Sequence, residues 1–152
     1  MICTSIKDKT YAQIVELLSD GSVEMAEIRL DLCPLVDGQI EELFSQSDVP
    51  LVATCRVAEV GENTAFRRLE TAIRAGARYA DLEIEAPVAM SKAFQKLCRE
   101  CGTEIIRSYH DFSQTPSDEV LQMVLARCFR YGCDVAKIVT TCLSEDDAAR
   151  IE

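Results

Sequence analysis

Short apolar segments rich in β-branched residues alternate with longer segments of helical period along almost the whole chain. This alternation predicts parallel strands, because neighbouring parallel strands need a long crossover, usually a helix, to join them. Six segments fit strands, at residues 1–5, 25–30, 51–55, 79–84, 104–108 and 134–139. Helical segments follow them, at residues 10–18, 39–46, 64–75, 89–100, 117–131 and from 144 onward. The sequence therefore predicts an α/β fold in which helices cover a parallel sheet.

Glycines mark the ends of three of the predicted helices. Gly76, Gly102 and Gly132 each stand between a helical segment and the next predicted strand. A residue with positive φ commonly ends a helix, and glycine adopts that conformation without steric cost. No linker or internal repeat interrupts the 152 residues, so we expect residues 1–152 to form a single domain.

Two folds have this order of elements, a doubly wound open sheet and a (βα)8 barrel. A doubly wound nucleotide-binding sheet has a glycine-rich turn after its first strand, whereas residues 5–8 read Ser-Ile-Lys-Asp. We therefore favour a partial (βα)8 TIM barrel. A full barrel takes about 250 residues, so we expect six of the eight βα units here, with strands seven and eight absent.

Ionisable residues occur in or directly after the second to sixth predicted strands. A barrel gathers the carboxyl ends of its strands at one rim, where the active sites of such folds lie. Burying a charge is costly unless the charge is paired or used on a ligand. The residues that this pattern brings toward the rim are Glu27, Arg29, Asp31, Arg56, Asp81, Glu83, His110, Asp111 and Lys137.

Structural and functional interpretations of these residues stay open at this point. A lysine among aliphatic residues can pair with a carboxylate, and a single histidine is usually structural. In the functional interpretation, desolvation frees the Lys137 amine to form a Schiff base with a carbonyl, and His110 moves protons. Arg29 and Arg56 would then bind an anionic substrate. The convergence of these residue types on one rim favours function.

The eight cysteines indicate reduced thiols rather than a disulfide framework. They are Cys3, Cys33, Cys55, Cys98, Cys101, Cys128, Cys133 and Cys142. The first residues show no export signal, so a reducing compartment is the better interpretation and we expect a cytoplasmic protein. Cys98 and Cys101 form a C-x-x-C at a predicted helix end, and no second pair completes a zinc site. We therefore expect thiols in the core and on the surface, and no metal.

Charge and hydropathy exclude two classes of partner. The formal net charge is −10, and nucleic-acid affinity depends on basic groups that neutralise phosphates, so no nucleic acid is expected. No apolar run approaches the roughly 20 residues that cross a bilayer, so no membrane partner is expected either. A local pocket of arginines can still bind a small anion.

An ordered set of motifs resembles one known family. The motifs are E-I-R-L-D at 27–31, T-C-R at 54–56, D-L-E at 81–83, S-Y-H-D-F at 108–112 with T-P at 115–116, and A-K-I at 136–138. Together they resemble type I 3-dehydroquinate dehydratase, a Schiff-base (βα)8 lyase of the shikimate pathway of aromatic amino acid biosynthesis. The resemblance implies dehydration of 3-dehydroquinate to 3-dehydroshikimate without a metal or organic cofactor.

The resemblance also implies a role for each matching residue. Lys137 matches the lysine that forms an imine with the substrate C3 ketone, and His110 matches the base that removes the C2 proton. Four further residues match groups that bind the substrate or line its site: Glu27, Arg29, Arg56 and Phe112. The resemblance also implies a homodimer, because dimers are common in this family.

One family motif departs from its usual spacing. The family has a glutamate that orients the histidine, four residues after an arginine, and this sequence reads R-V-A-E-V-G-E-N from Arg56. Glu59 falls one position early and Glu62 two positions late, and we favour Glu59. Two other interpretations stay open, namely another Schiff-base barrel lyase or aldolase, and a non-catalytic remnant or interaction module of the same family.

Overall fold

The computed structural model describes residues 2–151 and has six parallel strands in one sheet, as the sequence predicts. The strand order is β1-β2-β3-β4-β5-β6, and each neighbouring pair is parallel. The strands are β1 (Cys3–Ile6), β2 (Met25–Arg29), β3 (Leu51–Thr54), β4 (Tyr79–Glu83), β5 (Glu104–Asp111) and β6 (Val135–Thr140).

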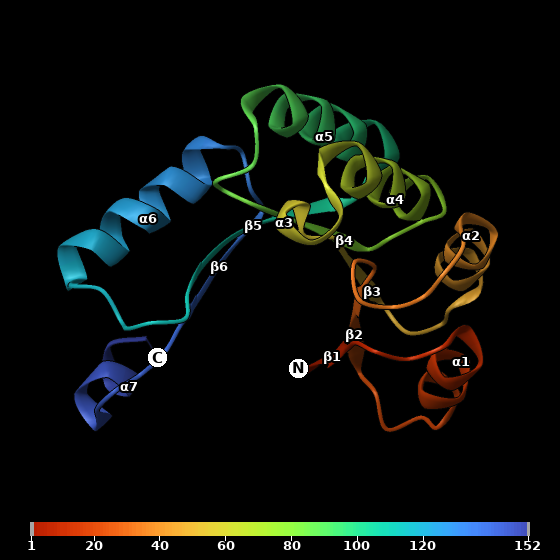
Figure 1. Ribbon diagram of the computed structural model, residues 1–152, viewed down its shortest axis with the longest axis horizontal. Coiled ribbons are helices and arrows are strands. Elements are labelled where there is room, and N and C mark those ends of the chain that lie inside the picture. The colour runs from red at the N-terminus through yellow and green to blue at the C-terminus, as the bar shows by residue number, and fades with distance from the viewer. Residues whose placement is uncertain (1, 152) are drawn as a thin grey trace.

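One or two helices follow each strand, and the longer helices lie on the outer side of a curled sheet (Figure 1). They are α1 (Tyr11–Ser19), α2 (Asp37–Gln46), α3 (Val57–Val60), α4 (Glu62–Arg74), α5 (Val88–Cys101), α6 (Asp118–Arg130) and α7 (Glu145–Ile151). The strands follow an arc from β1 to β6, and the sheet forms a half-barrel (Figure 1). The expected partial TIM barrel is therefore confirmed.

The curled sheet has two open edges in the described part of the chain. β1 pairs there with β2 and β6 pairs with β5, and the two edge strands are not joined to each other. Each edge strand therefore has one side of its backbone without a strand partner among residues 2–151.

Two details differ from the sequence prediction. The fifth strand extends to Asp111, so His110 lies within β5 rather than after it, because His110 pairs with Val139 and Asp111 with Thr140 of β6. The short helix α3 was not predicted, because four residues are too few to show a helical period. The helix-ending glycines are confirmed: φ is 108° at Gly76 and 73° at Gly102 and Gly132.

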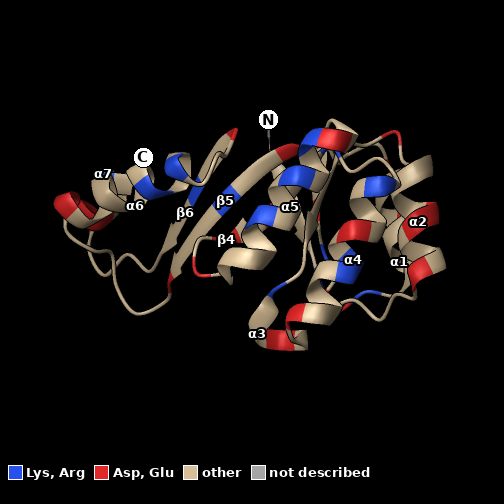
Figure 2. Ribbon diagram, turned by 90° about the horizontal axis from the view of Figure 1, so that it is seen from above, with Lys and Arg blue, Asp and Glu red and all other residues tan. Residues whose placement is uncertain are grey.

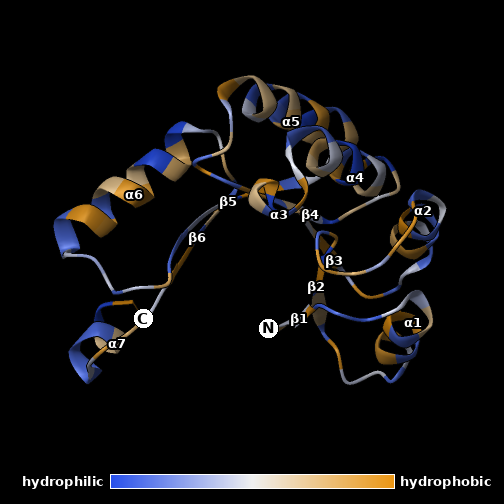
Figure 3. Ribbon diagram, viewed as in Figure 1, coloured by the Kyte–Doolittle hydropathy of each residue, from blue (hydrophilic) through white to orange (hydrophobic). Residues whose placement is uncertain are grey.

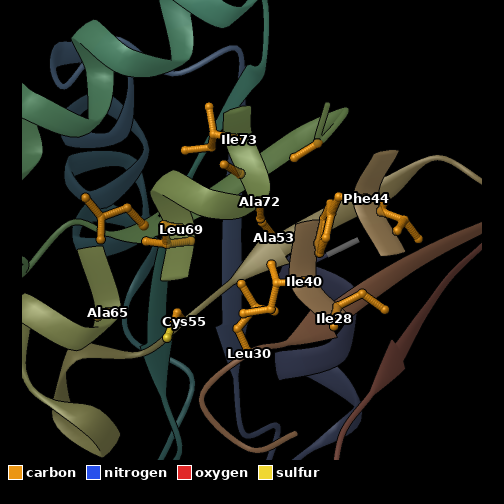
Figure 4. Packing of buried hydrophobic residues seen from close by; sticks show 14 of the residues in the cluster. Ile28, Leu30, Ile40, Phe44, Ala53, Cys55, Ala65, Leu69, Ala72 and Ile73 are labelled. Atoms are coloured by element: carbon orange, nitrogen blue, oxygen red, sulfur yellow. The ribbon is translucent and has the colours of Figure 1, made fainter. Parts of the chain in front are cut away.

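The main core lies between the sheet and the outer helices. Figure 4 shows Leu69, Ala72 and Ile73 of α4 close to Ile40 of α2 and Ala53 of β3. Each of these five side chains is almost fully buried. This burial supplies the driving force that holds the helices on the convex side of the sheet.

The outer helices are amphipathic, as a helix packed on a sheet should be. Hydrophobic and hydrophilic residues alternate around their circumference (Figure 3), and charges of both signs are interspersed along α4 and α5 (Figure 2). In the part of the chain that the structure describes, none of these helices is long and apolar enough to cross a membrane.

Replacing Leu69 tests the helix–sheet core. The Leu69 side chain is fully buried, so Leu69→Ala should leave a cavity and lower the free energy of unfolding by about 2–5 kcal/mol. Leu143→Ala is the matched control, because Leu143 is 73% exposed and its truncation should change stability by less than about 0.5 kcal/mol. Urea denaturation of both variants measures this difference, and equal losses would contradict the assigned core.

Candidate active site

The concave side of the sheet holds an amine between two carboxylates. Lys137 of β6 places Nζ 2.8 Å from Oε1 of Glu27 on β2 and 3.2 Å from Oδ2 of Asp81 on β4. These three strands are not neighbours in the sheet. Their side chains therefore meet only because the sheet curls, and the sequence prediction that they gather at one place is confirmed.

The carboxylates raise the pKa of Lys137 above its ordinary value. Burial opposes protonation of the amine, but the negative charges of Asp81 and Glu27 and their hydrogen bonds outweigh it. In Glu27, burial also favours the neutral form, yet Lys137 and the Thr54 hydroxyl lower its pKa to about 2. At neutral pH the site therefore contains an ammonium group beside the ionised carboxylate of Glu27. This corrects the expectation that burial leaves Lys137 as a free amine in the resting site.

Asp81 connects the lysine to the rest of the site. Its side chain is 0% exposed, and Oδ1 accepts hydrogen bonds from Ser108 Oγ at 2.5 Å and Arg56 Nη1 at 3.2 Å. Oδ2 accepts from Arg56 Nη2 at 3.1 Å and from Lys137 Nζ at 3.2 Å. Asp81 was expected at the rim from the strand pattern, but no role in the site was predicted for it. The sequence pattern that could have indicated a role is the placing of Asp81 and Glu83 on one face of the strand, on either side of Leu82.

Arg56 follows β3 and lies at the centre of the rim. Besides Asp81, its guanidinium contacts Glu83 Oε2 and Ser108 Oγ, both at 3.0 Å, and lies 3.3 Å from His110 Nε2. The other oxygen of Glu83 accepts a hydrogen bond from the backbone N–H of Val57 at 3.2 Å, which fixes the start of α3. Arg56 therefore points into the site, as predicted.

His110 is held in a form suited to accept a proton. Burial lowers the pKa of its imidazole below the ordinary value, and the positive charge of Arg56 lowers it further. The ring also lies against Phe112, with 5.7 Å between ring centroids. At neutral pH the imidazole is therefore mainly neutral, which is the form that a general base requires.

The other candidate residues lie around the same site with fewer contacts to it. Arg29 is paired with Asp31, with hydrogen bonds of 3.0 and 2.6 Å, and its guanidinium is partly exposed. Phe112 is 77% exposed. Glu59 is exposed on α3, and among residues 2–151 no hydrogen bond joins it to His110. Its role in orienting the histidine stays a prediction.

These side chains surround an open hollow of about 510 Å³. The volume is in the range of small-molecule sites. Basic, acidic and imidazole groups converge on it, so it can bind a polar anion and move protons at a carbonyl compound. The lining residues are Glu27, Arg29, Arg56, Ala58, Glu59, Glu83, Glu85, His110, Phe112, Lys137 and Val139.

The cysteines lie mainly away from this chemistry. All eight are free thiols, of which Cys33, Cys55, Cys98 and Cys128 are buried. Burial raises the pKa of Cys98 to about 12, so its thiol is unreactive at neutral pH. Helix α5 ends at Cys101, and Gly102 follows in the left-handed conformation, which confirms the C-x-x-C segment as a helix end.

Comparison with known proteins identifies the family. A family model described as type I 3-dehydroquinase matches residues 2–152. The 3-dehydroquinate dehydratase of Desulfotalea psychrophila is 31% identical over 159 residues, which cover 99% of this chain and 69% of that protein. The protein of the same name from Methanopyrus kandleri is 34% identical over 164 residues, covering 99% of this chain and 72% of that protein.

Solved structures agree on the fold. A crystal structure of type I 3-dehydroquinate dehydratase from Clostridium difficile superposes with a TM-score of 0.84 at 23% identity, covering 97% of this chain and 66% of that one. Deoxyribose phosphate aldolase from Aeropyrum pernix shares the fold more distantly, with a TM-score of 0.63 at 14% identity. From the family match and the sequence identities, this chain belongs to the type I 3-dehydroquinase family, a family of hydro-lyases.

Proposed function

We propose that the residues of this chain dehydrate 3-dehydroquinate to 3-dehydroshikimate through a Schiff base on Lys137. One observation carries the proposal: the Lys137 amine lies between Glu27 and Asp81 at the wall of a hollow that His110 also lines. The substrate is taken from the relatives, which are named 3-dehydroquinate dehydratase.

The first step is imine formation. Lys137 is an ammonium group in the resting site, so it first gives one proton to the neutral imidazole of His110. The amine nitrogen then attacks C3 of the substrate, and the carbonyl oxygen leaves as water after taking protons, one of them returned by His110. The product is a protonated imine, so the nitrogen carries one positive charge before and after the step.

The second step is elimination. The protonated imine withdraws electrons and acidifies the C2–H bond, and neutral His110 takes that proton to give an enamine. The enamine electrons then form the C1–C2 double bond, and the C1 hydroxyl leaves as water with the proton from His110. Water finally hydrolyses the imine and restores Lys137, so the net reaction releases one water molecule.

Binding of the anionic substrate falls to the remaining residues of the hollow. Arg29 and Arg56 line the hollow with guanidinium groups, whose positive charge suits the oxygens of an anionic substrate. Glu27 faces the same space with a carboxylate that can accept hydrogen bonds from hydroxyls. Phe112 lines the hollow next to His110, and Glu59 is proposed to act on the histidine from α3.

The remaining expectations concern partners and compartment. We propose no nucleic-acid partner because the net charge is −10. We propose a cytoplasmic location because eight free thiols suit a reducing compartment. The homodimer implied by the resemblance stays a prediction, which sedimentation analysis can test.

Borohydride trapping tests the Schiff base directly. Incubation with 3-dehydroquinate and borohydride should attach one reduced adduct to the Lys137 peptide, as read by mass spectrometry. Lys137→Ala should abolish the adduct, whereas Lys92→Ala should retain it, because Lys92 is an exposed lysine on α5.

Each other result of this experiment has a defined meaning. Trapping with a different aldehyde or ketone but not with 3-dehydroquinate would favour another Schiff-base lyase or aldolase. Absence of any adduct from the protein with an intact fold would favour a non-catalytic member of the family. An adduct that persists in Lys137→Ala would remove the proposed nucleophile.

The histidine can be titrated without ambiguity because the chain contains only one. Burial and Arg56 both lower the pKa of His110, so NMR titration of its imidazole should give a midpoint below the ordinary value of 6.5. Below that midpoint the imidazole is protonated and cannot act as a base, so activity should fall as the pH drops through it. A midpoint above 6.5 would contradict the described surroundings of the ring.

A further inference from the structure

The two carboxylates that contact Lys137 lie in different environments. Glu27 lines the hollow and its side chain is 11% exposed. Asp81 is not part of the lining, is 0% exposed, and has both oxygens occupied by Lys137, Arg56 and Ser108. Asp81 therefore lies beneath the amine, on the side away from the space that a substrate would enter.

Imine formation changes the hydrogen bonds at the lysine but not its charge. An ammonium group has three N–H bonds and a protonated imine has one, while each carries one positive charge. In the resting site, the Lys137 ammonium group can therefore donate hydrogen bonds to both carboxylates. As a protonated imine, it can donate a hydrogen bond to only one of them. Glu27 faces the substrate space and can turn to substrate hydroxyls, whereas Asp81 is fixed by two other residues.

We propose that Asp81 is a positioning residue that balances the positive charge on the Lys137 nitrogen both before and after imine formation. It also fixes the distance between that nitrogen and Arg56, because one of its oxygens contacts both groups. The inference rests on the proposed function and adds Asp81 to the residues that it uses.

The charge around Lys137 includes groups from every neighbouring strand. Asp81 and Glu27 raise the pKa of the lysine, and burial opposes them. Positive charge on Arg56 lies on the other side of Asp81. The titratable or charged groups near Lys137 are Cys3 on β1, Glu27 and Arg29 on β2, Arg56 after β3, Asp81 and Glu83 on β4, and His110 on β5.

The two acidic residues of β4 provide a matched pair of variants. Asp81 and Glu83 both contact Arg56, but only Asp81 contacts Lys137. Asp81→Asn and Glu83→Gln each remove one negative charge from the same strand with little change in shape. A purely structural role, or a general loss of negative charge near Arg56, would affect the two variants alike.

The experiment measures the protonation of Lys137 in the full chain without substrate. Acetic anhydride labels neutral amines, and mass spectrometry of the Lys137 peptide over a pH series gives the midpoint. The midpoint should fall by about 1–3 pH units in Asp81→Asn, as expected for loss of an adjacent opposite charge, and by less than half as much in Glu83→Gln. An unchanged midpoint in Asp81→Asn, or equal falls in both variants, would overturn the proposal.

A second variant decides the question if Asp81→Asn does not fold. Glu27→Gln removes the carboxylate that faces the hollow and leaves Asp81 beneath the amine. The Lys137 midpoint should then fall by less than about one unit, whereas a fall of more than about two units would assign the charge balance to Glu27 and overturn the proposal.

Borohydride trapping separates this inference from the proposed function. If wild-type protein forms the 3-dehydroquinate adduct, Asp81→Asn should trap it at least about tenfold more slowly than Glu83→Gln, because Asp81 no longer holds the Lys137 nitrogen in position beside Arg56. Equal trapping in the two variants would overturn the inference and leave the Schiff base intact. If wild-type protein forms no adduct but the Lys137 labelling midpoint falls in Asp81→Asn as predicted, only the proposed function is refuted.

Discussion

A carboxylate with no exposed surface is tolerated in the middle of a parallel sheet only when neighbouring groups balance its charge. Asp81 satisfies this condition with Arg56, Lys137 and the hydroxyl of Ser108. Removing one member of a buried ion pair leaves an uncompensated charge and typically costs about 3–5 kcal/mol. The positions of these side chains are therefore coupled, and the geometry of the site follows from the requirement to keep Asp81 paired.

The curl of the sheet brings the partners of Asp81 within contact distance. Glu27, Asp81 and Lys137 come from strands that are separated by one strand each, so a flat sheet would hold them too far apart for contact. The outer helices pack on the convex side of the curled sheet, where Leu69 and Ile73 are buried (Figure 4). The apolar layer and the charged layer thus occupy opposite faces of the same strands, as alternation of side chains along a strand requires.

Sequence reasoning predicted the elements that depend on local pattern. Alternation of apolar strands and helical segments, with glycines at helix ends, was enough to predict the six parallel strands. The position of Arg56 at the end of its strand and of Lys137 in the middle of its strand brought both toward one rim. The family motifs added the roles of His110 and Lys137. Hydrogen-bond partners could not be predicted in this way, because they depend on which strands face one another across the concave side.

Three features show where that limit lies. Asp81 and Glu83 lie on the same strand and both alternate with aliphatic residues, so the sequence pattern is the same for both. Only the three-dimensional contacts show that Asp81 is buried and that Glu83 lies at the rim. Arg107 is almost fully buried outside the site, where its guanidinium lies over the rings of Phe94 and Tyr131 and contacts Ser91. Its odd spacing from His110 on the same strand places Arg107 on the opposite face of the sheet, but the rings that it contacts cannot be predicted from the sequence. Likewise, the length of β5, and with it the setting of His110, depends on pairing with β6.

A crystal structure of the protein after reaction with 3-dehydroquinate and borohydride would show whether Lys137 forms the Schiff base while it stays paired with Asp81. We expect continuous electron density from Lys137 Nζ to C3 of the reduced substrate, with Asp81 within hydrogen-bond distance of that nitrogen and His110 facing C2. Density for the adduct on another residue, or an adduct on Lys137 whose nitrogen has moved away from Asp81, would contradict this expectation.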